Sequence, residues 1–204
     1  MKKSLLLAAT VCCFTIAANA QLPHFGGKIG LNFADFHGSD ASSIDGHGTR
    51  TGLVVGAYMT YDFIPLIGIQ PEVLYSMKGT SGSTQGVDYT FSANYIEVPV
   101  LLKLNIPMAP GTPVKVNVYA GPDFAFNVAS SVEASGNGQS QTTDESNNTK
   151  GFDFNLAFGG GVGFGIGPAT LGLDLRYSLG TGTIDKTGGD IKNGVFALMA
   201  TVGF

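Results

Sequence analysis

The 204-residue chain has no tryptophan, only 2 cysteines and only 11 basic residues. Both cysteines, Cys12 and Cys13, lie before residue 21, so a chain cleaved there would carry neither a disulfide nor a reactive thiol. The basic residues form no cluster in the rest of the chain, which argues against nucleic acid as a partner. No run of 18 apolar residues follows residue 20, so no transmembrane helix is expected there.

The chain does contain much apolar character, and it is dispersed. The mean hydropathy is +0.21, which is high for a secreted soluble protein. The 30 glycines disfavour a helical protein, because glycine is costly in helix interiors. Apolar composition without a long apolar run is typical of strands that each turn one face toward lipid.

The first residues have the pattern of a secretory signal. Lys2 and Lys3 precede an uncharged apolar stretch, and Ala18 to Ala20 form an A-x-A cleavage site. The apolar stretch is too short to span a membrane comfortably, which argues against a retained anchor. We expect a signal peptide at residues 1–20 and a single domain at residues 21–204 with nine basic and fifteen acidic residues.

Eight segments alternate apolar and polar residues with a period of two, the period of a β-strand. In the clearest one, residues 152–166, Phe152, Phe154, Leu156 and Phe158 face one side while Asp153 and Asn155 face the other. The predicted strands cover about 27–36, 51–63, 66–78, 89–105, 114–128, 152–166, 169–180 and a last segment that ends at Phe204.

The connections between these strands alternate in length. Three are short and contain proline, at 64–65, 106–113 and 165–168. Four are long and polar, at 37–50, 79–88, 129–151 and 181–192, and the stretch 135–150 is expected to be mobile. An even strand count with short and long connections in turn predicts an all-β fold, an eight-stranded antiparallel up-and-down transmembrane β-barrel.

Aromatic residues are expected to form two belts at the membrane interfaces. Tyr89 and Phe91 fall out of phase with the rest of their strand, so we expect a bulge near residues 92–94. The belt at the long-loop end is predicted to contain Phe33, Tyr75, Phe91, Phe124, Phe126, Phe152, Phe154, Tyr177 and Phe196, and the other belt Tyr61, Phe63, Phe164 and Phe204.

The inward positions carry charges of both signs. The predicted polar network of the lumen consists of Lys28, Glu72, Glu97, Lys103, Lys115, Asp123, Asp153, Asp174 and Arg176. An eight-stranded barrel is only wide enough for its own side chains, so we expect these residues to pair and to fill the interior. The alternatives are a narrow polar channel for small solutes or a small ligand site.

Catalytic and metal-binding patterns are weak. His37 and His47 share the first long loop with several serines, but the spacing fits no compact metal motif and no G-x-S-x-G elbow is present. The glycines at 159–163 open no helix and precede no lysine, so they do not form a phosphate-binding loop. We therefore expect no enzyme activity, no cofactor and no metal, with an embedded lipid-modifying enzyme as the rival.

Four segments together resemble a known family. They are Gly26–Asn32 (GGKIGLN), Gly68–Tyr75 (GIQPEVLY), Tyr95–Lys103 (YIEVPVLLK) and Tyr119–Pro122 (YAGP). The chain is similar over residues 21–204 to the outer-membrane β-barrel domain of Bacteroidetes, labelled porin family or PorT-like. The resemblance implies an eight-stranded outer-membrane barrel, and some relatives are linked to protein secretion. It supplies no catalytic residue.

The sequence thus predicts a non-enzymatic integral outer-membrane protein with a filled lumen and surface-exposed loops, in a structural, binding or secretion-accessory role. Both termini are expected in the periplasm. Expected partners are outer-membrane lipid, a protein or surface ligand at the long loops, and the assembly machinery, for which Phe204 is the predicted signal. The structural rival is a soluble ligand-binding barrel, which would carry its apolar face inward.

Overall fold

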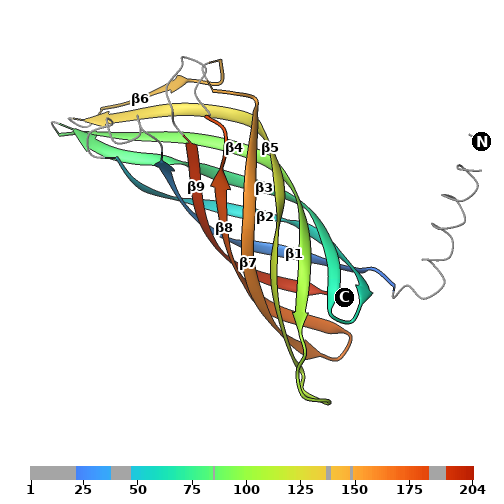
Figure 1. The fold of residues 1–204 in the computed structure, drawn as a ribbon. Coiled ribbons are helices and arrows are strands. Elements are labelled where there is room, and N and C mark those ends of the chain that lie inside the picture. The colour runs from blue at the N-terminus through green and yellow to red at the C-terminus, as the bar shows by residue number, and fades with distance from the viewer. Residues whose placement is uncertain (1–21, 38–46, 85, 137–138, 148, 184–191) are drawn as a thin grey trace, which may run out of the picture.

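The computed structural model describes residues 22–37, 47–84, 86–136, 139–147, 149–183 and 192–204, and every described regular element is a strand (Figure 1). Within these residues no helix is long and apolar enough to cross a membrane. The strands are β1 His24–His37, β2 His47–Ile64, β3 Ile67–Thr84, β4 Val87–Ile106, β5 Val114–Gly136, β6 Gln139–Asp144, β7 Phe152–Ile166, β8 Ala169–Gly180 and β9 Lys192–Gly203.

Eight of these strands close into a barrel. The order around the sheet is β4-β3-β2-β1-β9-β8-β7-β5, and β4 pairs with β5 to close the ring. All pairings are antiparallel. The remaining strand, β6, is not part of the ring; it pairs only with the last residues of β5, from Ser131 to Gly136. Closure leaves no free edge along the barrel wall. The predicted eight-stranded antiparallel barrel is confirmed.

The two faces of the wall differ as the alternation predicts. On β8 the side chain of Leu173 is 55% exposed, whereas its neighbour Asp174 is 4% exposed. On β7 the outward Leu156 and Phe158 are exposed, and the inward Asn155 is fully buried. Apolar side chains therefore cover the outside of the barrel and polar ones fill the inside, the reverse of a soluble barrel.

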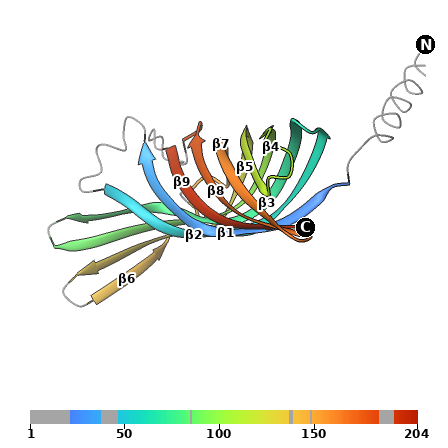
Figure 2. The same cartoon turned by 90° about the horizontal axis from the view of Figure 1, so that it is seen from below.

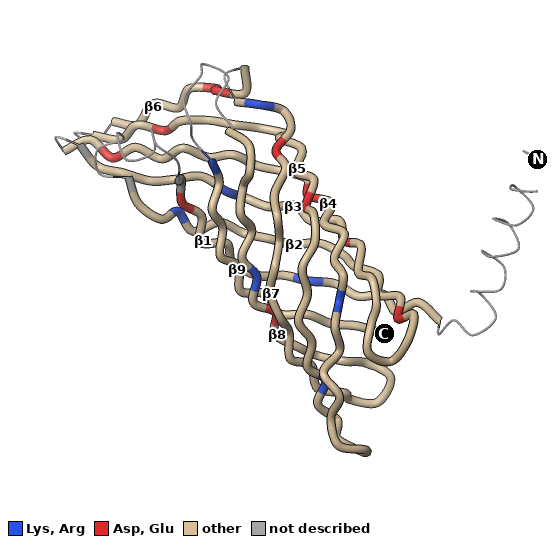
Figure 3. Tube along the Cα trace, viewed as in Figure 1, with Lys and Arg blue, Asp and Glu red and all other residues tan. Residues whose placement is uncertain are grey.

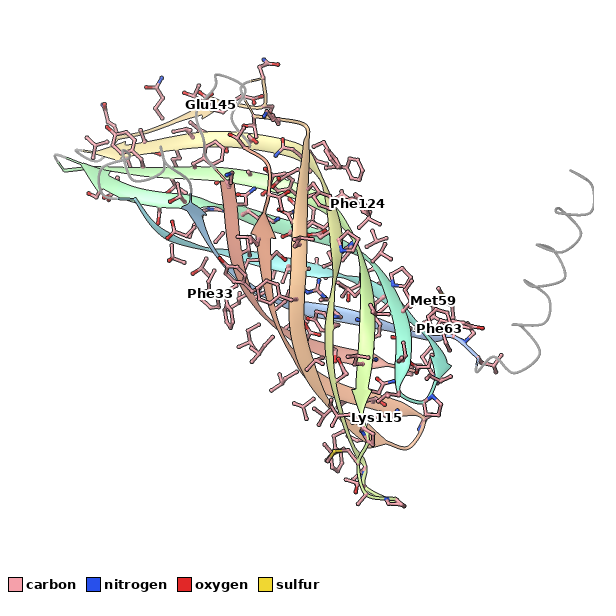
Figure 4. The ribbon with its side chains drawn as sticks, in the orientation of Figure 1. Phe33, Met59, Phe63, Lys115, Phe124 and Glu145 are labelled. Atoms are coloured by element: carbon pink, nitrogen blue, oxygen red, sulfur yellow. The ribbon has the colours of Figure 1, made fainter. Side chains whose placement is uncertain are left out.

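Outward aromatic side chains pair across neighbouring strands. Phe124 on β5 packs on Phe154 of β7 with ring centroids 5.6 Å apart, and Phe33 on β1 lies 6.3 Å from Phe196 on β9. Phe33 and Phe124 lie on the outer surface of the wall, and Phe63 lies near the opposite end (Figure 4). Phe91 was wrongly predicted in the aromatic belt at the long-loop end, because its partly buried side chain packs inside the barrel.

A register shift between β4 and β5 at Asn94 and Tyr95 confirms the bulge predicted near residues 92–94, but not its assignment to β4. β4 keeps an unbroken register with β3, so Phe91 stays in phase with the buried Ala93 and Tyr95. The extra residue lies on the opposite strand. Asn94 pairs with position 129 and Tyr95 with position 127, which leaves Val128 of β5 without a partner on β4. The sequence cue was therefore real, but the bulge belongs to the neighbouring strand.

The short connections lie where they were predicted, at one end of the barrel. The termini of the barrel domain meet at the same end, where Phe204 and Phe25 exchange backbone hydrogen bonds of 2.8 and 3.3 Å. We call this the short-turn end; the C-terminus marks it in Figure 1.

Two predicted long loops are instead largely strand. β3 and β4 stay paired as far as Thr84 and Val87, within the predicted loop 79–88. The stretch 135–150 contains the end of β5 and the whole of β6, which pair from Ser131↔Asp144 to Gly136↔Gln139. These strands project beyond the barrel as a sheet (Figures 1 and 2). Polar residues such as serine and threonine did not signal strands, because these extensions bury no apolar face.

Candidate functional site: the barrel interior

The candidate site lies in the lumen, where charged side chains from opposite walls meet. In the eight-strand ring β3 and β8 are four positions apart, and so are β1 and β5. Each pair therefore faces across the barrel diameter. Inward positions on β1, β3 and β8 carry charged side chains that meet here, and β5 adds Tyr119. Figure 3 marks the charged positions along the strands in blue and red.

Five inward residues form what we call the central ring: Lys28, Glu72, Tyr119, Asp174 and Arg176. Arg176 Nη2 donates to both carboxylate oxygens of Glu72, at 2.9 and 2.8 Å. Lys28 Nζ lies 2.8 Å from Glu72 Oε1 and 3.2 Å from Asp174 Oδ2. Tyr119 Oη donates to Asp174 Oδ1 at 2.6 Å and accepts from Arg176 Nε at 3.3 Å. The five side chains are thus linked in a closed cycle of contacts that extends across the lumen.

The central ring is electrically balanced and buried. Two cations face two carboxylates, and each of the five residues is at most 5% exposed. Gln70 adds a hydrogen bond of 2.7 Å to Glu72 Oε1. Charge-assisted hydrogen bonds are stronger than neutral ones, and here Arg176 Nη2 bridges both oxygens of Glu72 from the opposite wall. The ring therefore occupies the cross-section that an open pore would need.

A glycine on β7 makes room for the ring. A Cβ atom at Gly159 would lie 2.7 Å from Tyr119 Oη and 2.9 Å from its Cζ. Only a glycine therefore lets the tyrosine lie against this wall. Apolar side chains pack beside the ring, in one cluster of Val54, Leu74, Ala197 and Met199 and another of Leu101, Tyr119 and Ala157.

A second polar group, the outer cluster, lies nearer the long-loop end. It consists of Lys78, Glu97, Asp123, Asp153, Asn155 and Asn193. Lys78 Nζ forms an ion pair with Glu97 Oε1. Asn193 Nδ2 donates to Asp153 Oδ2 at 2.9 Å, and Asn155 Nδ2 lies 3.4 Å from Asp123 Oδ2.

The outer cluster is less balanced than the central ring. It contains three carboxylates and one lysine. Among the described residues, Asp123 Oδ1, Asp153 Oδ1 and Asn155 Oδ1 are buried without a hydrogen-bond partner. A buried acceptor without a donor is costly, so these oxygens favour a proton, water or a cation. No group of three or more His, Cys, Asp or Glu side chains in the described part of the chain is placed to hold a metal ion.

A cavity of about 500 Å³ lies between the central ring and the short-turn end. We call it the pit. Lys28 and Asp174 of the ring are among its lining residues, together with Asp62, Lys103 and Lys115. Lys115 lies near the short-turn end of β5 (Figure 4). Its Nζ donates to Thr170 Oγ1 at 3.3 Å.

The nine predicted lumen residues thus fall into three groups. Lys28, Glu72, Asp174 and Arg176 meet in the central ring; Glu97, Asp123 and Asp153 lie in the outer cluster; Lys103 and Lys115 line the pit. The prediction omitted Lys78, Tyr119, Asn155 and Asn193. Lys78 could have been included, because it is a charged residue at an inward position. Nothing in the sequence distinguishes a tyrosine or asparagine that joins the network from other polar residues at inward positions.

The residues of the rival enzymatic site lie largely outside the described part of the chain. Residues 38–46 are not described, and neither are the side chains of His37 and His47. The predicted signal peptide, residues 1–20, is also outside the described residues. Both remain predictions.

Comparison with known proteins places this fold in a family. The model of the outer membrane protein β-barrel domain family matches residues 19–185. Among solved structures, the chain is similar to the outer membrane protein OprG from Pseudomonas aeruginosa, with 13% identity, a TM-score of 0.54, and 90% of this chain and 95% of that chain covered. It is also similar to a major outer membrane protein from Thermus thermophilus, with 15% identity, a TM-score of 0.51, and 90% and 100% covered.

At these identities the structural likeness establishes the fold alone. A search of curated proteins returns no match. The family match covers most of the chain and the structure supplies the closed barrel with its apolar outside. The chain therefore belongs to the outer membrane protein β-barrel domain family and is an outer-membrane β-barrel protein.

Proposed function

We propose that this protein is a non-conducting, non-enzymatic barrel that anchors a binding surface outside the outer membrane. The central ring is the observation that carries the proposal. Its side chains come from walls that face each other, and the contact between Glu72 and Arg176 crosses the barrel diameter. A lumen filled in this way has no continuous path for solutes.

The energetics of buried charge support a permanently closed ring. Removing one partner of a buried ion pair leaves an uncompensated charge, which costs roughly 3–5 kcal/mol. Opening the ring would strand Glu72 from Arg176 and Lys28 in the same way. Each increase of about 1.4 kcal/mol in free energy lowers the population of a state tenfold. An opened ring that costs several kcal/mol is therefore populated rarely. Steady conduction is therefore not expected.

The binding surface would be the sheet that projects beyond the barrel. We define this outer sheet as residues 81–84 of β3, 87–90 of β4, 131–136 of β5, and β6. Its strands are paired side by side, as at Asp88↔Ser135 and Glu133↔Thr142. All six residues of β6 are exposed and polar. A paired sheet holds its side chains in fixed positions, which favours recognition of a protein or other surface ligand.

The remaining parts of the proposal concern orientation and assembly. We infer that the short-turn end and both termini face the periplasm, since short turns lie on that side in outer-membrane barrels. We also infer that the assembly machinery reads the last strand through its terminal Phe204. The resemblance to PorT-like proteins of Bacteroidetes adds a secretion-accessory role as one use of the outer sheet.

A narrow channel is the second candidate, and the pit favours it. The cavity of about 500 Å³ already opens part of the lumen from the short-turn end. On this alternative the central ring would be the main barrier between the pit and the outer cluster, and a path would need both polar groups to rearrange. The two proposals therefore differ in whether the lumen is closed in the wild-type protein at rest.

Planar-bilayer recording separates the two candidates. We expect the purified wild-type protein to give no steady channel events, and the double variant Glu72→Ala/Arg176→Ala to conduct, because both sides of the ring are truncated. Leu175→Ala is the matched control, since Leu175 precedes Arg176 on β8 but is exposed on the outer face. It should be silent. Steady events from the wild-type protein would favour the channel.

A further inference from the structure

The pit is lined by charged groups of both signs in a protein whose formal net charge is −4. Two of its charged lining residues, Lys28 and Asp174, already have partners within the neutral central ring. The charges that remain in the pit are Lys103 and Lys115 against Asp62 and the terminal carboxylate of Phe204. The two signs balance in number. Any preference for a ligand of negative charge therefore depends on whether an individual lysine is left without a partner.

Lys103 is the group that lacks a partner. It lies on β4 directly opposite Tyr119 of β5, which places it at the closed, ring-side floor of the pit. Its side chain is half-buried, yet among the described residues its ammonium has neither an ion-pair nor a hydrogen-bond partner. Asp62, one of the two remaining carboxylates, accepts a hydrogen bond of 3.0 Å from Asn105 Nδ2.

Lys115 lies on the same inward face, four residues nearer the short turn than Tyr119. It is exposed and lies toward the mouth of the pit, with only the hydroxyl of Thr170 as a hydrogen-bond partner. A cation at the mouth and a second one at the floor make a graded path for an anion, because the surrounding wall has a low dielectric constant and focuses the field. The amide of Asn117 on the same wall adds a neutral donor.

The size of the pit matches a small molecule. Ligand cavities are commonly roughly 300–1,000 Å³, and the pit has about 500 Å³. That volume exceeds the need of a single bare ion. The central ring closes the inner side, so the ligand must enter and leave by the short-turn end.

We propose that the pit is a binding site for a small solute that carries a carboxylate or phosphate group, held by Lys103 at the floor and Lys115 at the mouth. The bound anion would receive charge-assisted hydrogen bonds from both ammonium groups. It would reach the site from the short-turn side without crossing the barrel. This site is independent of the outer sheet and of whether the ring conducts, so it goes beyond the proposed function.

The test uses the full-length protein folded in a non-ionic detergent, with inorganic phosphate and citrate as probes at constant ionic strength. Lysines carrying ¹³C-methyl labels report each ammonium separately by NMR. We expect the Lys103 signal to shift and saturate with citrate or phosphate, and the Lys115 signal to follow. The signal of Lys150, which lies between β6 and β7 at the other end, should stay in place and serves as the internal control.

Single lysine variants then show how much each lysine contributes to the affinity for citrate. Lys103→Gln should weaken citrate binding at least tenfold by calorimetry, Lys115→Gln should weaken it less, and Lys150→Gln should leave it unchanged. Heat-dependent gel migration checks that each variant is folded; the labelled wild-type protein answers the question if Lys103→Gln does not fold. Failure of both probes to give a saturable Lys103 shift, or undiminished affinity in folded Lys103→Gln, would overturn the proposal. A Lys103 shift produced only by phosphatidylglycerol vesicles, and not by either soluble probe, would also overturn it.

Discussion

The central ring and the outer cluster share one lumen but differ in how their charges are balanced. In the ring two cations face two carboxylates, and Glu72 receives hydrogen bonds from Arg176 and Gln70. In the outer cluster one lysine serves three carboxylates, and Asp123 and Asp153 each keep one buried oxygen without a donor. Similar residue types thus make a satisfied network in one region and an unsatisfied one in the other.

The difference follows from where the partners come from. The ring collects residues from β1, β3, β5 and β8, which surround the lumen, so every charge meets an opposite charge. In the outer cluster Asn155 and Asn193 supply amide donors where a second cation would be needed. On the proposed function the ring is the part that must stay intact, whereas the outer cluster is a region where removal of charge should be tolerated.

The largest expected effect comes from removing the negative charge of Glu72 from the ring. Glu72→Gln should reduce the free energy of unfolding by roughly 3–5 kcal/mol, because Arg176 and Lys28 would both lose their shared carboxylate inside the barrel. Urea titration of the protein refolded into lipid vesicles, read by gel migration, measures this change. A loss below about 1 kcal/mol would show that the ring contributes no more than an exposed ion pair.

How far the sequence predicts these two regions depends on what periodicity can tell. Alternation assigned Glu72, Asp174 and Arg176 to the inner face, because each neighbours an outward apolar residue. It could not say that Glu72 meets Arg176, since residues 104 positions apart meet only through the strand order and the tilt of the closed barrel. The face was therefore predictable and the partner was not.

The errors have similar physical causes. Phe91 was assigned to the outer belt because the bulge was placed on its own strand rather than at Val128 of β5. The sequence of β5 contains no feature that identifies Val128 as the extra residue. β6 was missed because its six polar residues have no apolar face to bury. Its strand conformation comes from backbone pairing with β5, a tertiary contact that composition does not record.

The second test checks the inside-outside assignment on which the comparison depends. Leu173 adjoins Asp174 on β8 but is exposed on the outer face. Leu173→Arg should reduce the free energy of unfolding by roughly 2–4 kcal/mol if the residue lies near the bilayer midplane. The loss should appear in lipid vesicles and shrink in detergent. Equal stability of the variant and the wild type in vesicles would mean that this face does not contact acyl chains.

The third test removes a carboxylate whose loss should not destabilise the protein, in contrast to Glu72→Gln. Asp123→Asn removes one of three buried carboxylates from the outer cluster and keeps the side-chain shape. We expect an unchanged free energy of unfolding or a gain of about 1 kcal/mol, since the unpaired Oδ1 is lost as an uncompensated charge. The same urea titration compares it with Glu72→Gln. A destabilisation as large as that of Glu72→Gln would remove the distinction between the two regions.

The smallest effect on equilibrium stability is expected at the C-terminus, where both regions depend on one seam. Lys28 of the ring lies on β1 and Asn193 of the outer cluster on β9, the first and the last strand of the barrel; the pairing of these two strands is the seam. Phe204 is 68% exposed beyond the last pair, so Phe204→Ala should change the free energy of unfolding little. It should nevertheless lower the yield of folded protein in the outer membrane if the assembly machinery reads this residue.

Thr201→Ala is the control on the same strand, and folded yield in membrane fractions is the measurement. Because the seam serves both regions, Phe204→Ala should lower the yields of Glu72→Gln and Asp123→Asn by the same factor and leave their difference intact. Matching yields for Phe204→Ala and Thr201→Ala would remove Phe204 as an assembly signal. A yield loss confined to one of the two lumen variants would instead show that the seam is coupled to that region alone, and the two clusters would then differ in their order of assembly as well as in their charge balance.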